Sequence, residues 1–162
     1  MTPDAAATVL AHCRALSWRL ATAESCTGGL IAARLTEIAG SSDVVVGGIV
    51  AYHNDAKRRH LGVAADTLER EGAVSEAVAL QMARGAQLAF DADLAVAVTG
   101  IAGPGGGTAA KPVGLVHLAV TARGLAPLHR RCVFPGDRRQ IRAATVEAAL
   151  DLLLEALAAS AA

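Results

Sequence analysis

The segment DLAVAVTG, residues 93–100, decides the fold because it is apolar without interruption between Asp93 and Thr99. A short continuous apolar run that contains β-branched Val is typical of a strand that is buried on both faces of a sheet. Such a strand needs a helical layer on each side of the sheet. The segment therefore predicts an inner strand of an α/β domain, with Thr99 near its carboxyl end.

Helix-like and strand-like patterns alternate on both sides of this run. Apolar residues at helical spacing predict helices, and short β-branched runs predict strands. Upstream, this gives helices at 4–16, 26–40, 54–61 and 76–90, and strands at 19–23 and 43–52. Downstream, it gives a hairpin of strands at 113–122 and 127–134, and a helix at 137–159. We predict an α/β, three-layer α/β/α sandwich whose mixed sheet includes a C-terminal antiparallel hairpin, as one domain over residues 1–162.

Composition excludes several classes of protein. Apolar residues make up 53% of the 162-residue chain, but no run reaches the roughly 20 residues of a membrane span. The first residues carry Asp4 and lack the basic and apolar regions of a secretory signal. Cys13, Cys26 and Cys132 form no C-x-x-C pair, so we predict neither a disulfide framework nor a metal site. The net charge is zero. We therefore expect a cytoplasmic protein with no membrane or nucleic-acid partner.

The two lysines are conspicuous because the other thirteen of the fifteen basic residues are arginines. A lysine can lose its proton near neutral pH when it is desolvated, whereas an arginine cannot. Lys57 and Lys111 are thus candidates for a neutral amine, and Tyr52, the only tyrosine, precedes Lys57 by five residues. A solvated helix face beside Arg58 and Arg59 explains Lys57 equally well. The five histidines offer alternative bases, but no motif marks one of them.

The stretch ATAESCTGGL, residues 21–30, carries Ser25 where a predicted strand passes into a predicted helix. Backbone N–H groups at such a point favour a phosphate or a developing oxyanion. Ser25 is either a nucleophile or only a helix cap, and known serine motifs such as G-x-S-x-G do not match it. Cys26 competes for the nucleophile role, or packs into the core as a free cysteine.

The segment IAGPGGGTAAKPVG, residues 101–114, is a long glycine-rich loop directly after the buried strand. Ligands in open α/β sheets gather outside the carboxyl ends of strands, which places Thr99 and this loop beside Ser25. Glycines let a backbone approach a phosphate closely, although a mobile loop without a ligand has the same composition. Arg138 and Arg142 lie four residues apart and could grip a phosphate or pair with surface acids.

Several blocks together carry a family resemblance. AESCTGG, GGIVAYHNDAK, LGV, EGAVSEAVA, AVTGIAGPGGG, KPVG and GDRRQIR occur in that order. They resemble the competence/damage-inducible CinA family, specifically its C-terminal nicotinamide-nucleotide amidase domain of the PncC type. The resemblance runs from about residue 20 to residue 150. His53 departs from it, since a smaller polar residue is expected there.

The resemblance implies hydrolysis of the carboxamide of nicotinamide mononucleotide to nicotinate mononucleotide and ammonia, without metal or cofactor. Ser25 would be the nucleophile, Lys57 its general base, and Tyr52 a hydroxyl in the same network. N–H groups at the start of the helix that is predicted from Cys26 would stabilise the oxyanion. A homodimer or larger homo-oligomer is expected. The substrate-binding residues would be Cys26, Thr27, Gly28, Gly29, Thr99, Gly100, Gly103, Gly105, Arg138 and Arg142.

Two other functions remain open. A nucleotide-binding regulatory module linked to competence or DNA damage would use the glycine loop and the arginines without needing Ser25 or Lys57. An amidase for a related amide would use the same two residues on another substrate.

Overall fold

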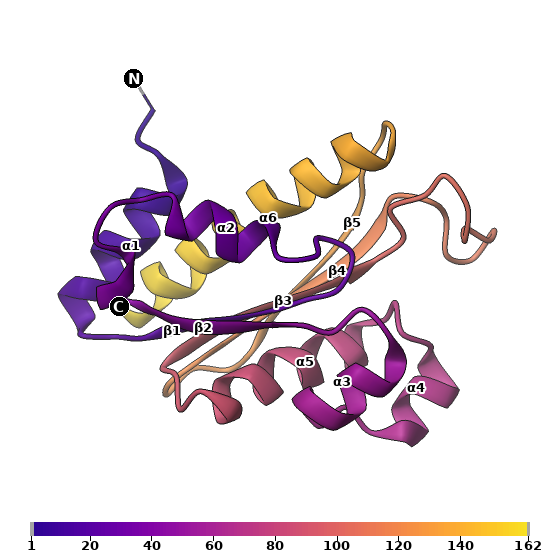
Figure 1. Ribbon diagram of the computed structural model, residues 1–162, viewed down its shortest axis with the longest axis horizontal. Helices are drawn as coiled ribbons and strands as arrows, with labels where there is room; N and C mark the ends of the chain where they lie inside the picture. The colour runs from indigo at the N-terminus through magenta and orange to yellow at the C-terminus, as the bar shows by residue number, and fades with distance from the viewer. Residues whose placement is uncertain (1, 162) are drawn as a thin grey trace.

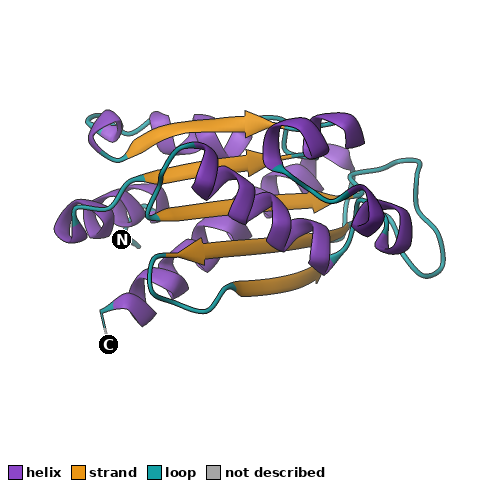
Figure 2. Ribbon diagram, turned by 90° about the horizontal axis from the view of Figure 1, so that it is seen from below, coloured by secondary structure: helices purple, strands orange, loops and turns teal. Residues whose placement is uncertain are grey.

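A five-stranded sheet in the order β2-β1-β3-β4-β5 forms the centre of the computed structural model, which describes residues 2–161 (Figure 2). Strand β1 (Leu20–Glu24) pairs in parallel with β2 (Val45–Val50) and with β3 (Leu94–Gly100). Strands β4 (Leu115–Ala122) and β5 (Leu128–Val133) add an antiparallel hairpin beside β3. The sheet is therefore mixed, as the sequence predicted.

Helices cover both faces of the sheet, which gives three layers (Figure 1). One layer holds α1 (Ala5–Leu16), α2 (Leu30–Thr36) and α6 (Arg138–Ser160). The other holds α3 (Asn54–Leu61), α4 (Ala65–Glu71) and α5 (Glu76–Ala89). A 3-10 turn, Ser41–Asp43, precedes β2. The predicted α/β/α sandwich is confirmed.

The buried strand β3 serves two cores at once. Leu94, Val96 and Val98 pack with α1 and α6, whereas Ala95 and Ala97 pack with α5. Successive side chains of a strand point to opposite faces, so one apolar run supplies both layers. The alanines on the second face leave room for α5 to approach the sheet.

The start of one helix was predicted wrongly, and one helix was missed. The helix predicted from Cys26 begins at Leu30 and ends at Thr36. The glycine pair explains the delay, because Gly28 and Gly29 have φ values of +60° and +107°, which break a right-handed helix. The helix α4 was not predicted.

Among residues 2–161, no helix combines the length and the apolar character needed to cross a bilayer.

The topology brings three predicted site segments together. Parallel strands β1, β2 and β3 end at the same edge of the sheet, and Ser25, Tyr52 and Thr99 lie at or just beyond these ends. The loop between β3 and β4 leaves from this edge and extends away from the sheet (Figures 1 and 2).

Candidate active site

Ser25 is held directly after the last residue of β1. Its N–H donates to the carbonyl of Val98 on β3 (3.1 Å), so the sheet ladder fixes its backbone. Its own carbonyl accepts from the N–H of Gly28 (3.0 Å), which closes the first turn after the strand. The residue is 8% exposed. Ser25 is therefore a nearly buried serine on a rigid turn.

Lys57 reaches Ser25 from the middle of α3. Its Nζ lies 3.0 Å from Ser25 Oγ and donates to the main-chain carbonyl of Tyr52 (3.1 Å). The residue is 1% exposed, and no carboxylate within residues 2–161 forms an ion pair with it. Burial lowers the pKa of Lys57, and Cys26 opposes this shift only as a secondary effect. The site thus holds an amine that loses its proton more easily than a solvated lysine.

Tyr52 contacts Lys57 through its main chain rather than its phenol. The phenol oxygen accepts from Nη2 of Arg138 (2.8 Å). Nη1 of the same arginine donates to the carbonyl of Gly103 (2.8 Å). Arg138 therefore joins the start of α6 to Tyr52 and to the glycine-rich loop. The predicted role of the Tyr52 hydroxyl in the proton network stays a prediction.

Glu24, the last residue of β1, is a buried carboxylate that sequence reasoning gave no role. It is 1% exposed, and its Oε1 accepts from the Thr27 hydroxyl (2.6 Å) and from the N–H of Ile31 (2.8 Å). Its Oε2 accepts from the N–H of Ala32 (3.1 Å). These are the N–H groups that open α2, so the start of this helix is capped by Glu24. The signal was present, since a charged residue ends an otherwise buried strand.

The N–H groups predicted for an oxyanion belong to a turn instead of a helix. Within residues 2–161, the backbone N–H groups of Cys26 and Thr27 form no hydrogen bond with another residue. Arg142 binds the carbonyl groups of this turn. Its Nε donates to the Cys26 carbonyl (3.0 Å) and its Nη2 to the Thr27 carbonyl (3.1 Å). The prediction that Arg142 binds the phosphate stays a prediction.

Cys26, the alternative nucleophile, and the histidines, the alternative bases, lie in environments that differ from those of Ser25 and Lys57. Cys26 is buried, and burial raises the pKa of its thiol to about 11, so it is protonated at neutral pH. His117 lies next to His129, with 2.9 Å between ring nitrogens, and burial lowers the pKa of His117 to about 4. His53 caps α3 by accepting from the N–H of Asp55 (3.1 Å). Among the described residues, only Lys57 forms a side-chain hydrogen bond with Ser25 Oγ.

A cavity of about 290 Å³ opens at this edge of the sheet. The Thr99 hydroxyl lies on it and donates to the carbonyl of Ala73 (2.9 Å), so its oxygen remains able to accept. The predicted residues that line the cavity are Ser25, Cys26, Tyr52, Lys57, Thr99, Gly100, Gly103, Gly105 and Arg138. Thr27, Gly28, Gly29 and Arg142 are not among the lining residues. The first three form the turn next to the cavity, and Arg142 binds this turn from α6.

A larger cavity, about 500 Å³, lies at the opposite edge of the sheet. It is lined by Arg84, Gln87 and Arg123 together with neighbouring residues. Arg123 is already paired with the buried Asp93 (2.6 Å), and no serine, lysine or cysteine is among the described residues that line this cavity. The chemistry of the lining, rather than the volume, therefore selects the smaller cavity as the candidate active site.

Comparison with known proteins identifies the family. The model of the CinA C-terminal domain matches residues 3–157. The chain belongs to the CinA C-terminal domain family. A CinA-like protein from Mycolicibacterium vanbaalenii is 57% identical over 138 residues, which cover 85% of this chain and 33% of that protein. A CinA-like protein from Gemmatimonas aurantiaca is 47% identical over 155 residues, or 96% of this chain and 36% of that protein.

Solved structures of CinA relatives have the same fold. The competence/damage inducible protein CihA from Agrobacterium tumefaciens is 54% identical, with a TM-score of 0.92 over 97% of this chain and 98% of that chain. The competence damage-inducible protein A from Klebsiella pneumoniae is 42% identical, with a TM-score of 0.91 over 95% of each chain. The CinA domain described here spans about a third of the length of the curated relatives it matches. The family resemblance drawn from the sequence motifs is confirmed.

Proposed function

We propose that this CinA C-terminal domain hydrolyses the carboxamide of nicotinamide mononucleotide to nicotinate mononucleotide and ammonia. The observation that carries the proposal is the buried Lys57 Nζ, 3.0 Å from Ser25 Oγ, on a cavity at the carboxyl edge of the sheet. A serine hydroxyl is a weak nucleophile until a base within hydrogen-bond reach takes its proton. The lowered pKa of Lys57 and its contact with Ser25 Oγ support its amine as that base.

The first step forms an ester between Ser25 and the substrate. Neutral Lys57 takes the hydroxyl proton while Ser25 Oγ attacks the carboxamide carbon. The negative charge that develops on the carboxamide oxygen is stabilised by the N–H group of Cys26, which lines the cavity, whereas the N–H group of Thr27 is fully buried. The C–N bond then breaks, the Lys57 ammonium returns its proton to the leaving nitrogen, and ammonia departs.

The second step removes the acyl group with water. Lys57, neutral again, takes a proton from a water molecule as the water oxygen attacks the ester carbon. Collapse of the second oxyanion breaks the bond to Ser25 Oγ, and the Lys57 proton returns to that oxygen. The new carboxylic acid loses its proton to solvent, nicotinate mononucleotide leaves, and the enzyme regains its starting protonation state.

Substrate phosphate is assigned to the cavity mouth. Arg138 lines the cavity, is solvent-exposed, and carries N–H donors beyond the two that bind Tyr52 and Gly103. A guanidinium suits an anion such as a phosphate. Nothing within 4 Å would meet a side chain at Gly105, so the loop leaves open space there. Binding energy from the distant phosphate positions the ring for attack, and free nicotinamide should be a much poorer substrate.

The test is ammonia release from nicotinamide mononucleotide by the purified protein, with a chelator present and Ser25→Ala as the control. Chelator-resistant release that disappears in Ser25→Ala supports the proposal. Faster release from free nicotinamide than from the nucleotide would contradict the substrate assignment. A folded wild-type protein that binds the nucleotide without releasing ammonia would favour a regulatory nucleotide-binding module, in line with relatives named for competence and damage induction.

A further inference from the structure

We propose that Glu24 and Arg142 are positioning residues that hold the turn after Ser25. The Glu24 carboxylate accepts hydrogen bonds from donors of the turn and of the helix that follows it, and the Arg142 guanidinium donates to carbonyl groups of the turn. In this arrangement they fix the Ser25 hydroxyl and the N–H group of Cys26, which lines the cavity, in the geometry that attack requires. The inference rests on the proposed function, because it takes Ser25 as the nucleophile.

Glu24 ties the strand before Ser25 to the helix after it. As the last residue of β1, it pairs with Val50 on one side and Val98 on the other, so its backbone is fixed by two strands. Both carboxylate oxygens are engaged by donors from Thr27 and from the first turn of α2. The two ends of the turn are thereby fixed relative to each other.

The carboxylate does this without acting on Lys57. Its charge lies at the start of α2, where the unpaired N–H groups of a helix favour an anion. Lys57 forms no ion pair with Glu24, and Glu24 is not among the groups that shift the Lys57 pKa. Glu24 is also a poor candidate for a second base, because its oxygens are already occupied by three donors.

Arg142 sets the direction of the peptide planes within the turn. In a trans peptide the N–H points opposite to the carbonyl of the preceding residue. The guanidinium holds the Cys26 carbonyl, so it also fixes the direction of the Thr27 N–H. The Ser25 carbonyl is held by the Gly28 N–H, which fixes the Cys26 N–H in the same way. Both N–H groups, which have no partner in another described residue, are thus oriented before any substrate binds.

Gly28 gives this turn its left-handed backbone. Its φ of +60° is unfavourable for residues with a side chain, whereas a Cβ there would make only ordinary contact with Arg142 Nη2, at 3.4 Å. The glycine pair of this motif therefore shapes the turn and also delays the start of α2. Glu24 and Arg142, together with the groups of this turn and of α2 that they bind, are called the clamp below. The clamp joins four elements, because β1, the turn, α2 and α6 each contribute a partner.

The test compares Thr27→Val with Thr27→Ser and adds Glu24→Gln. Thr27 is fully buried, and valine keeps its shape while removing the hydroxyl that binds Glu24. Glutamine keeps one acceptor oxygen but presents an amide hydrogen to one of the N–H donors. We expect kcat to fall roughly 100-fold in Thr27→Val and Glu24→Gln, as expected for a misplacement of about 1 Å, with KM changed less than about threefold. Thr27→Ser should retain most of the activity.

Three readouts separate positioning from a merely structural role. Thermal unfolding must show that each variant is folded at the assay temperature. The pH midpoint of kcat/KM should equal that of the wild type, because Glu24 does not act through Lys57. The rate at which a fluorophosphonate labels Ser25 should fall together with kcat, since this probe forms an Oγ–P bond, releases fluoride and needs the same geometry without the nucleotide.

The outcomes are decisive in each direction. The proposal is overturned if Thr27→Val and Glu24→Gln, while folded, keep kcat and the labelling rate within about twofold of wild type, or if the pH midpoint moves. If wild type does not hydrolyse the nucleotide yet labels at Ser25, the proposed substrate fails, and the labelling rates of the variants still decide on the clamp. If wild type neither hydrolyses nor labels, the nucleophile and the clamp both fail.

Discussion

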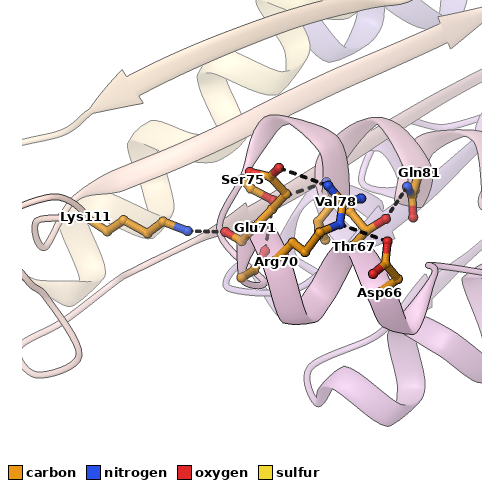
Figure 3. Close-up of polar contacts among 9 residues, drawn as sticks. Asp66, Thr67, Arg70, Glu71, Ser75, Val78, Gln81 and Lys111 are labelled. Carbon is orange, nitrogen blue, oxygen red and sulfur yellow. Dashed lines mark hydrogen bonds and ion pairs between the residues drawn. The ribbon is translucent and has the colours of Figure 1, made fainter.

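Ser25 and Ser75 are both 8% exposed, and each lies close to one of the two lysines, yet the lysines do different things. Lys57 Nζ contacts the Ser25 hydroxyl. Lys111 donates instead to the main-chain carbonyl of Glu71, near Ser75, as Figure 3 shows. The Ser75 hydroxyl donates to the carbonyl of Gly72 (2.9 Å) and accepts from a backbone N–H at the start of α5 (3.3 Å).

The difference teaches when a serine before a helix is free for chemistry. Ser75 is the N-cap of α5, so its oxygen is used by the helix. At α2 the first N–H groups of the helix are capped by Glu24 instead. The Ser25 oxygen is therefore available to contact Lys57. Lys57 is almost fully buried, whereas Lys111 is partly exposed, so only the first is strongly desolvated.

The largest effect on activity is expected when the two lysines are replaced, which sharpens the contrast between the two serine–lysine regions. Lys57→Arg keeps the positive charge but cannot supply a neutral amine, so kcat/KM should fall by about 10²- to 10⁴-fold, the usual contribution of a general base. Lys111→Arg is the matched control and should stay within about twofold of wild type. Steady-state ammonia release measures both, and near-normal turnover by Lys57→Arg would remove Lys57 as the base.

An intermediate effect is expected from pH. Burial lowers the pKa of Lys57 below its ordinary value of 10.5, and the neutral amine is the active form. The rate constant kcat/KM should therefore rise about tenfold per pH unit and level off at a midpoint below 10.5. Lys111→Arg should show the same midpoint. A profile that is still rising at pH 10.5, or that falls with pH through the neutral range, would speak against a desolvated lysine base.

The smallest effect is expected from the second serine. Ser75→Ala removes the N-cap of α5 and should lower the free energy of unfolding by about 1 kcal/mol, with little change in turnover per folded molecule. Ser25→Ala should do the opposite, with a smaller loss of stability and no ammonia release. Urea unfolding and single-concentration assays on both variants measure this, and a loss of activity in folded Ser75→Ala would break the comparison.

Local patterns predicted much of the fold. The uninterrupted apolar run around Val96, the glycine-marked turns and the amphipathic helices each reflect interactions within a few residues. The start of α2 was misplaced because the left-handed backbone of Gly28 and Gly29 outweighs the helix-compatible spacing after Cys26. The helix α4 was missed because its seven residues carry only one fully buried side chain, that of Thr67, and so show little periodicity.

The sequence by itself determined the order of the strands and of all helices except α4, the family motifs, and the placement of Ser25 and Thr99 near strand ends. Only the tertiary structure decided which groups meet. Ser25 and Lys57 are 32 residues apart, and Cys26 and Arg142 are 116 apart. Their contacts depend on how α3 packs on α5 and how α6 crosses the sheet. Periodicity along the chain carries no information on contacts between residues so far apart. The capping of α2 by Glu24 instead of a serine depends on the same packing.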